Sequence, residues 1–196
     1  GGVRGAGGGV LDAPGGCGGM GAGEGREMSV VGGNGEVLEA VRPVMAVLGS
    51  EIVHVGGPGS GRVVKLCNNI LSAINMEALG GVLVTGVKAG VELEVLAKVL
   101  TAGTGGSWGL SNHLPATIFA GDDSTRFALE LMHKDVWLFL RAAEEQGLST
   151  PLAAVAGQTL RIAKSEGYGP ADYSAIIHYF EHLAQLILVP EKEAAL

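Results

Sequence analysis

The sequence predicts a mainly α fold, in which an all-α domain around a long central helix follows the last few strands of an α/β domain. Two observations carry this prediction. Glycine, at 34 of 196 residues, is concentrated before Gly35, where short apolar runs alternate with loops. After Gly61, apolar residues instead recur at the three- and four-residue intervals of helices. The longest such stretch, from Gly59 to Gly90, is the predicted central helix.

Three short apolar runs before residue 59 predict strands. They span 10–13, closed by Pro14, then 28–31 and 52–55. Between the second and third runs, residues 36–48 have helical periodicity, with Val37, Val41, Val44 and Leu48 on one side. Pro43 lies inside this helix and should kink it or restrict its first turns. So few strands cannot form a freestanding sheet, and they predict the tail end of an α/β domain.

The central helix carries two kinds of interruption. Gly80 and Gly81 each weaken it by about 1 kcal/mol, so we expect another helix to lie close across them. Asn75, Glu77 and Lys88 interrupt its apolar half. These polar residues favour a helix buried in protein over a membrane span.

Further helices are predicted along the rest of the chain. They cover 93–100, 107–119 with a break near Pro115, 126–146, the stretch from a Thr150 cap to Gly167, and the stretch from an Asp172 cap to Pro190. Because residues 129–140 are apolar nearly all round, the helix over 126–146 should be buried. The last two helices should bury one stripe each: Leu152, Val155, Ala156, Leu160 and Ala163, then Ile176, Phe180, Leu183 and Ile187.

The charge and cysteine content of the chain indicate which partners and which cellular compartment to expect. The net charge is −7 and there is no cluster of Lys and Arg, which argues against nucleic acid and anionic membranes as partners. Cys17 and Cys67 have neither metal-ligand nor disulfide-framework spacing. A reducing, cytoplasmic setting is therefore expected. Organellar targeting stays open, because the chain begins at Gly1 rather than Met.

Lys65 and Asn69 are the first candidates for chemistry. They lie four residues apart near the start of the central helix, so both project from one face. A lysine and a carboxamide there can both address a substrate oxygen, and a dry site would lower the lysine pKa enough for general acid or base work. The alternative is a solvated lysine beside asparagines in an N-terminal turn.

Two glycine-rich stretches, 16–21 and 56–61, are further candidate binding sites. Residues 16–21 form a G-x-G-x-x-G, but no amphipathic helix follows, which favours a loop that exposes N–H groups to a substrate over a dinucleotide cradle. Residues 56–61 precede the central helix, where amides can meet an anion. A tight turn into the helix is the alternative favoured there.

The remaining polar residues give weaker signals. His133, Lys134 and Asp135 sit in an otherwise apolar segment and need partners or a function. His178 and His182 have i, i+4 spacing but lack a third ligand, so no metal site is predicted and a solvated face is favoured.

Taken together, these residues resemble the β-hydroxyacid dehydrogenase family, which includes 3-hydroxyisobutyrate dehydrogenase, tartronate semialdehyde reductase and glyoxylate reductase types. The resemblance covers almost the whole chain, from about Val10 to Leu186. It rests on ordered matches: Leu11-Asp12-Ala13-Pro14 before a glycine loop, Val31-Gly32-Gly33, Ile52 to Gly56, Gly59-x-Gly61-x-x-x-Lys65-x-x-Asn68-Asn69, Gly106-Ser107-Trp108, Phe127 and Lys134-Asp135.

The resemblance implies a domain plan. Residues 1–58 would be the remnant of a Rossmann-type NAD(P)-binding domain, 59–189 the all-α dehydrogenase domain, and 190–196 a tail. The family's Gly-rich cofactor fingerprint has no counterpart before Gly16. Most of the cofactor-binding half is therefore expected to be missing from this chain.

The resemblance also implies roles for particular residues. Lys65 matches the catalytic lysine, Asn69 the substrate-binding asparagine, and Lys134 a lysine near the cofactor. The loop of Gly16, Cys17 and Gly18 matches the substrate-anchoring segment, although Gly16 stands where the family has serine.

The expected function is an oxidoreductase that passes a hydride between NAD or NADP and a small hydroxy acid or semialdehyde, acting as a homo-oligomer joined by its helical domain. Two alternatives remain open. One is a non-catalytic dimerisation module or pseudoenzyme, and the other is an imine- or 6-phosphogluconate-type reductase.

Overall fold

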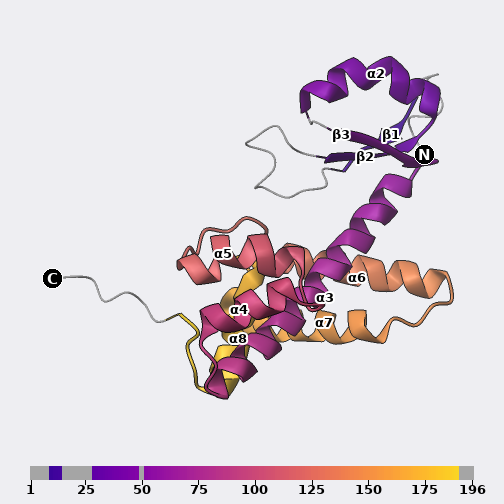
Figure 1. Ribbon diagram of the computed structural model, residues 1–196. Helices are drawn as coiled ribbons and strands as arrows, with labels where there is room; N and C mark the ends of the chain where they lie inside the picture. The colour runs from indigo at the N-terminus through magenta and orange to yellow at the C-terminus, as the bar shows by residue number, and fades with distance from the viewer. Residues whose placement is uncertain (1–8, 15–27, 49–50, 190–196) are drawn as a thin grey trace. The chain divides into compact units, whose positions relative to one another are not determined.

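The computed structural model describes residues 9–14, 28–48 and 51–189. They belong to two compact units, Gly1–Asn68 and Asn69–Leu196, and the division falls inside the longest helix. Helices dominate, and the three strands of the described sheet all come before α3 in the chain (Figure 1). The predicted fold class, mainly α with a few strands before an all-α part, is confirmed.

The first unit contains the sheet. Its strands are β1 (Leu11–Asp12), β2 (Met28–Gly33) and β3 (Glu51–Gly56), in the order β1-β2-β3. β1 runs antiparallel to β2, and β2 runs parallel to β3. The helix α2 (Gly35–Leu48) makes the crossover between the parallel strands, as parallel pairing requires. Asn34 caps α2, because its Oδ1 accepts the N–H of Glu36 at 2.7 Å.

The helix predicted over 36–48 is present as α2. Its most buried apolar residue is Leu38, which is 1% exposed and lies in the core of this unit with Val30 and Val31. Val44, on the apolar side that the sequence shows, is 69% exposed. Leu38 follows Val37 directly, which places it about 100° further round the helix than that residue.

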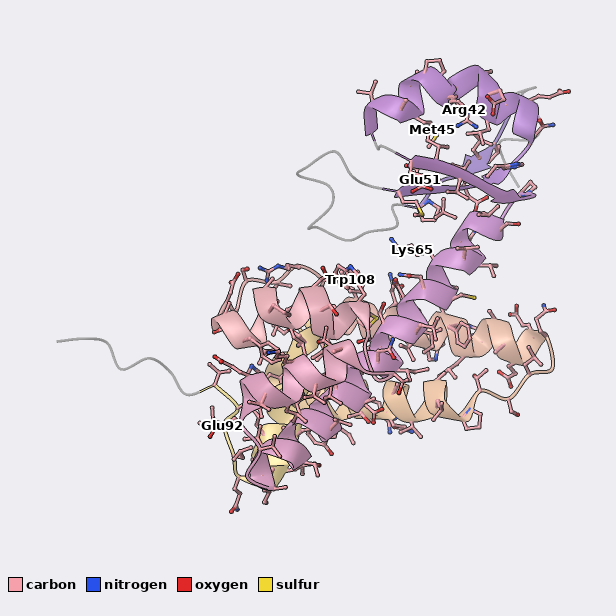
Figure 2. All side chains as sticks on the ribbon, viewed as in Figure 1. Arg42, Met45, Glu51, Lys65, Glu92 and Trp108 are labelled. Atoms are coloured by element: carbon pink, nitrogen blue, oxygen red, sulfur yellow. The ribbon has the colours of Figure 1, made fainter. Side chains whose placement is uncertain are left out.

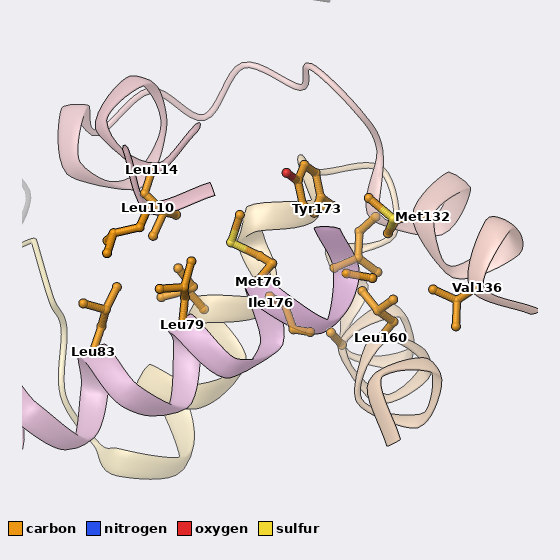
Figure 3. Packing of buried hydrophobic residues seen from close by; sticks show 14 of the residues in the cluster. Met76, Leu79, Leu83, Leu110, Leu114, Met132, Val136, Leu160, Tyr173 and Ile176 are labelled. Atoms are coloured by element: carbon orange, nitrogen blue, oxygen red, sulfur yellow. The ribbon is translucent and has the colours of Figure 1, made fainter. Parts of the chain in front are cut away.

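The second unit is built on α3 (Ser60–Lys88), which continues into it from the first unit. The buried residues of α3 keep helical spacing: Ile70, Ala73, Met76, Leu79, Leu83 and Val84. Around them pack α4 (Leu93–Ala102), α6 (Leu129–Glu145), α7 (Pro151–Ala163) and α8 (Ile176–Ala184). Figure 3 shows Leu79 and Leu83 directed toward Leu110 and Leu114, which belong to the same cluster and come from the chain between α4 and α6.

Within the described ranges, α3 is the one helix long and apolar enough to cross a membrane. A helix of this length and composition can also be the core helix of a globular protein. Met76, Leu79 and Leu83 belong to the main hydrophobic cluster. The apolar side of α3 is thus used for packing inside the protein.

The stretch predicted as one broken helix forms three short turns. These are a π-helical turn (Gly109–His113), α5 (Leu114–Ala116) and a 3-10 turn (Ile118–Ala120). The break falls at Thr117, whose ψ of −99° is not helical, rather than at Pro115. Pro115 lies in the first turn of α5, where a missing N–H costs nothing.

Burial of α6 differs most from the prediction. The helix begins at Leu129 and not at residue 126, because Ala128 is extended and bridges Asp172. One side is buried, through residues such as Met132 and Val136, but Trp137 is 50% exposed and Leu138 also faces outward. The expectation that α6 is buried all round is therefore wrong for this chain. Its packing partners, α7 and the turns before α8, cover a single side.

The last two helices also bury narrower stripes than predicted. In α7 the smaller residues Ala153, Ala156 and Ala163 are buried with Leu160, while Leu152 and Val155 are exposed. Thr150 occupies the cap position without a capping bond from its side chain. In α8 the helix ends at Ala184, because Gln185 adopts a left-handed conformation with φ of 51°. Leu183, inside the helix, and Ile187, beyond its end, are both exposed, and Leu188 returns to the core.

The predicted close approach at Gly80 is confirmed. A Cβ placed on Gly80 would lie 2.5 Å from Cδ2 of Phe180 in α8, far inside ordinary contact. The same construction at Gly81 meets Phe180 only at 3.8 Å, an ordinary van der Waals distance. Gly80 is thus required by packing, whereas Gly81 is not.

This difference between adjacent glycines gives a matched test. Gly80→Ala should lower the free energy of unfolding by about 1–3 kcal/mol, because the added methyl group overpacks the contact with Phe180. Gly81→Ala should raise it by up to about 1 kcal/mol, since alanine favours the helix. Urea denaturation of both variants measures the difference. Equal effects of the two substitutions would contradict the close approach.

A buried carboxylate closes the C-terminal end of the unit. Glu181 accepts the N–H of Leu188 at 2.6 Å and Nδ1–H of His178 at 2.6 Å. The hydrogen bond with Glu181 raises the pKa of His178, and Asp123 adds to this, while partial burial opposes it. Leu188 is thereby held in the core by its backbone as well as by its side chain.

The raised pKa of His178 predicts a pH-dependent stability. Its contribution should be complete below the ordinary histidine pKa of about 6.5 and should fade as pH rises through the raised value in the folded protein. His178→Gln should therefore lower the free energy of unfolding most in mildly acidic buffer and least above neutrality. Urea titrations across this range test it, with exposed His182→Gln as the control. A loss that stays constant with pH would contradict the assignment.

Candidate functional site

The N-terminus of α3 is held by the carboxylate of Asp12. Its Oδ1 accepts the N–H of Gly59 at 2.7 Å, and its Oδ2 accepts the N–H of Arg62 at 2.9 Å. Gly61 allows this approach, because a Cβ there would meet Oδ2 of Asp12 at 2.8 Å. The end of β1 is thus fixed to the start of α3.

This arrangement decides between the two interpretations of residues 56–61. Burial tends to raise the pKa of Asp12, but the N–H groups of Gly59 and Arg62 outweigh it and lower the pKa below its ordinary value. Ser60 donates its N–H to the carbonyl of Gly57, which closes a tight turn. Asp12 therefore occupies the N–H groups that an external anion, such as the pyrophosphate of a dinucleotide, would need.

Asp12→Ala should lower the free energy of unfolding by about 1–3 kcal/mol, because two N–H groups at the helix start lose a charged acceptor. Amide hydrogen exchange at Gly59 and Arg62 should accelerate in this variant. The exposed Glu51→Ala on β3 serves as the control. Unchanged exchange at both amides would show that Asp12 does not hold the helix start.

Lys65 lies in the second turn of α3 and is labelled in Figure 2. Its side chain is partly buried and has polar interactions of its own. Asn69 follows one helical turn later. The helix predicted to carry both residues is therefore present, with both in its first three turns.

Asn69 is buried and bonded to an acidic residue of another helix. Its Nδ2 donates to Oδ2 of Asp135 at 2.8 Å, across 66 positions of sequence. Nζ of Lys134 lies 3.2 Å from the other oxygen, Oδ1, of the same carboxylate. Two predicted site residues, Asn69 and Lys134, therefore both contact the carboxylate of Asp135. The sequence predicted that Asp135 needs a partner or a function, but not which residue that partner is.

The two basic neighbours on α6 have different environments. The side chain of Lys134 is 58% exposed, so its ammonium group is accessible to solvent beside Asp135. His133 is partly buried, and this burial lowers its pKa, with Lys164 and Arg161 adding to the effect. A neutral His133 is the form that this surrounding favours.

Part of the predicted site is not among the residues that the structure describes. The substrate-anchoring loop of Gly16, Cys17 and Gly18 falls outside the described residues. Cys67 is a free, exposed thiol on α3. Within the described part of the chain, no group of three His, Cys, Asp or Glu side chains could hold a metal ion.

A buried His–Asp pair was missed by the sequence reasoning. Nε2 of His113 and Oδ1 of Asp172 lie 2.7 Å apart, and both side chains are almost fully buried. Asp172 also accepts N–H bonds from Arg126 and Phe127, in addition to capping the turn at Ser174. The predicted cap is confirmed, but nothing in the spacing of the histidines pointed to His113 as its partner.

The network around Asp172 is polar yet fully satisfied. Burial tends to raise the pKa of Asp172, but the bonds from His113, Ser174 and Phe127 prevail and hold it well below its usual range. Burial and the Asp172 charge raise the pKa of the neighbouring Tyr173. The network joins three chain segments around residues 113, 126 and 172, and so fixes the segment that leads into α6.

Most of this chain matches the model of a known protein family. Residues 59–180 match the family model described as the NAD-binding domain of NADP-dependent 3-hydroxyisobutyrate dehydrogenase. The chain belongs to this family. The match covers well over half of the sequence and includes Lys65, Asn69 and Lys134.

Curated proteins with similar sequences are also dehydrogenases by name. The chain is 36% identical over 173 residues to 2-(hydroxymethyl)glutarate dehydrogenase of Eubacterium barkeri, covering 88% of this chain and 58% of that protein. It is 35% identical over 178 residues to NAD-dependent L-serine dehydrogenase of Pseudomonas aeruginosa, covering 88% and 60%. The chain thus spans well under two thirds of the length of these relatives, all of which are named as dehydrogenases.

Solved structures show the same fold. The 3-hydroxyisobutyrate dehydrogenase of Salmonella typhimurium superimposes with a TM-score of 0.79 at 28% identity, over 87% of this chain and 60% of that one. The Mycobacterium tuberculosis enzyme, solved with L-serine, gives 0.80 at 30% identity, over 86% and 60%. The recognition of the family from ordered sequence motifs is confirmed.

Proposed function

We propose that the chain forms the helical part of an NAD(P)-dependent dehydrogenase for small hydroxy acids or their semialdehydes. The observation that carries this proposal is the family match across 59–180, a range that includes Lys65 and Asn69 of α3. The buried Asn69–Asp135 bond supports it, because a side chain held in this way is suited to contact a substrate.

Lys65 is the proposed general acid and base. In the oxidation direction it takes the proton of the substrate hydroxyl at Nζ, and in reduction it returns that proton to the carbonyl oxygen. NAD or NADP, when bound, supplies the acceptor or donor of the hydride at the neighbouring carbon. Asn69 holds the reacting substrate by hydrogen bonds, and the amides of Gly16 to Gly18 hold its carboxylate.

Lys134 is the proposed contact to the cofactor. Its exposed ammonium group, balanced on one side by Asp135, fits an anionic or polar group of NAD or NADP. The start of α3 does not fit the cofactor pyrophosphate, since Asp12 takes the N–H groups of Gly59 and Arg62. The phosphates would therefore be bound by residues other than those at the start of α3.

The substrate class follows from chemistry that the relatives share. The names of three of them include 2-(hydroxymethyl)glutarate, L-serine and 3-hydroxyisobutyrate, each a small carboxylate with a hydroxymethyl group. We infer the same class for this chain, acting in the cytoplasm. The outward-facing Trp137 and Leu138 of α6 and Val155 of α7 support a homo-oligomer formed through the helical part.

The proposal is tested by cofactor titration and turnover. Purified protein is titrated with NADH and NADPH by fluorescence, then assayed with 3-hydroxyisobutyrate and L-serine as probes. Saturable cofactor binding would support the dehydrogenase, and any turnover should fall by about a hundredfold or more in Lys65→Ala, because the proton-transfer group is lost. The control Lys88→Ala, on the far end of the same helix, should retain full turnover.

One result would reject the enzyme in favour of a non-catalytic module. It is the absence of NADH binding, NADPH binding and turnover in a protein that light scattering shows to be a stable dimer. Turnover that survives Lys65→Ala would instead reject the role given to Lys65 while keeping the enzyme.

A further inference from the structure

We propose that His133, Arg161 and Lys164 form a binding site for a small oxyanion, of the kind that a phosphate or a carboxylate group presents. The three residues lie where α6 runs beside α7 and the π-helical turn that follows it, η4 (Lys164–Tyr168) (Figure 1). None of the three has a role in the proposed function, so the site is independent of it.

Two contacts determine which residues of α6 and α7 lie opposite each other. Nζ of Lys164 is 3.7 Å from Oε2 of Glu130. Further along the pair, a Cβ placed on Gly157 would lie 3.1 Å from Cγ1 of Val136. Higher residue numbers on α6 thus meet lower ones on α7, which means that the two helices run antiparallel.

This register brings three basic side chains to one surface. Position 133 of α6 lies between the two contacts and therefore opposite residues 160–161 of α7. Leu160 is buried in the core, whereas Arg161 is exposed. Lys164 follows Arg161 by three residues, and its backbone keeps the helical angles of φ −60° and ψ −40°. Side chains at this spacing are neighbours on a helix, so Lys164 and Arg161 both lie beside His133.

The charge at this surface is opposite in sign to that of the whole chain. The chain has a net charge of −7, yet the neighbours that act on half-buried His133 are the cations of Lys164 and Arg161. Partial burial, followed by these two cations, lowers the pKa of His133. The potential at the imidazole is therefore positive, and such a potential attracts anions.

The three side chains also supply the donors that an oxyanion needs. A guanidinium group can bind two oxygens at once, an ammonium group binds as a point charge, and an imidazole donates one N–H or, when protonated, two. The carboxylate of Glu130 offsets only part of this charge. Its contact with Lys164 is long, at 3.7 Å, and the two side chains are 49% and 46% exposed, so water screens the pair.

A titration followed by the imidazole ¹H–¹³C signals of His133 tests the proposal, with the signals assigned by their loss in His133→Gln. Sodium phosphate or, in a separate arm, sodium acetate replaces sodium chloride at constant ionic strength, so that screening stays the same. We expect a saturable shift with a dissociation constant on the order of 1 mM. The pKa of His133 should rise in the bound state, because the anion offsets the neighbouring cations. The arm that saturates identifies the site as one for phosphate, for carboxylate or for both.

Four variants connect the binding to the named residues. Arg161→Gln and Lys164→Gln should each weaken binding about fivefold or more, because each removes a charged donor. Glu130→Gln should tighten binding about twofold, since it removes the nearby negative charge. This gain of affinity cannot result from a damaged fold. Lys98→Gln, the same change at an exposed lysine of α4, is the matched control and should bind as the wild type does.

Three results would overturn the proposal. The His133 signals could show no saturable shift with either anion. The affinity of Arg161→Gln and Lys164→Gln could equal that of the wild type. Glu130→Gln could weaken binding, which would assign the cations to that carboxylate and not to a ligand. None of these measurements needs a cofactor or turnover, so a failure of the proposed function would leave the test of this site unaffected.

Discussion

Close packing against α3 is the interaction on which the helical unit depends. Gly80 has no Cβ, and the ring of Phe180 occupies the space that one would need. Gly86 accommodates Leu96 of α4 in the same way. These glycines weaken α3 as an isolated helix, so the stability of the unit comes from its neighbours and not from helix propensity. Because the neighbours are fixed on α3, the polar residues they carry are fixed relative to it as well.

Buried or partly buried carboxylates link chain segments that apolar packing brings together. Asp12, Asp135 and Asp172 each join segments far apart in the sequence, with separations of 47, 66 and 59 residues to their main partners. Glu181 does the same over a short range at the C-terminal end. Each carboxylate has at least two hydrogen-bond or ion-pair contacts, which offset the cost of removing its charge from water. Apolar contacts place the helices, and these acceptors determine which ends and side chains meet.

The sequence predicted periodic features well and tertiary ones poorly. Element types and most positions followed from apolar spacing and from glycine, and the close approach at Gly80 followed from the cost of glycine inside a helix. The burial of α6 could not be predicted, because an all-round apolar helix does not reveal which side its neighbours cover. The partners of Asp135 and Asp172 were equally hidden, since a carboxylate in a sequence carries no sign of a donor 66 or 59 residues away. Lys65 and Asn69 are predicted as site residues by ordered resemblance and not by spacing alone.

The central claim is the proposal that the chain belongs to a dehydrogenase in which Lys65 exchanges the hydroxyl proton of a small hydroxy acid. A crystal structure of the protein grown with NADPH and L-serine tests it most directly. The account predicts the serine hydroxyl within hydrogen-bond distance of Nζ of Lys65. Serine bound away from Lys65 would contradict the account.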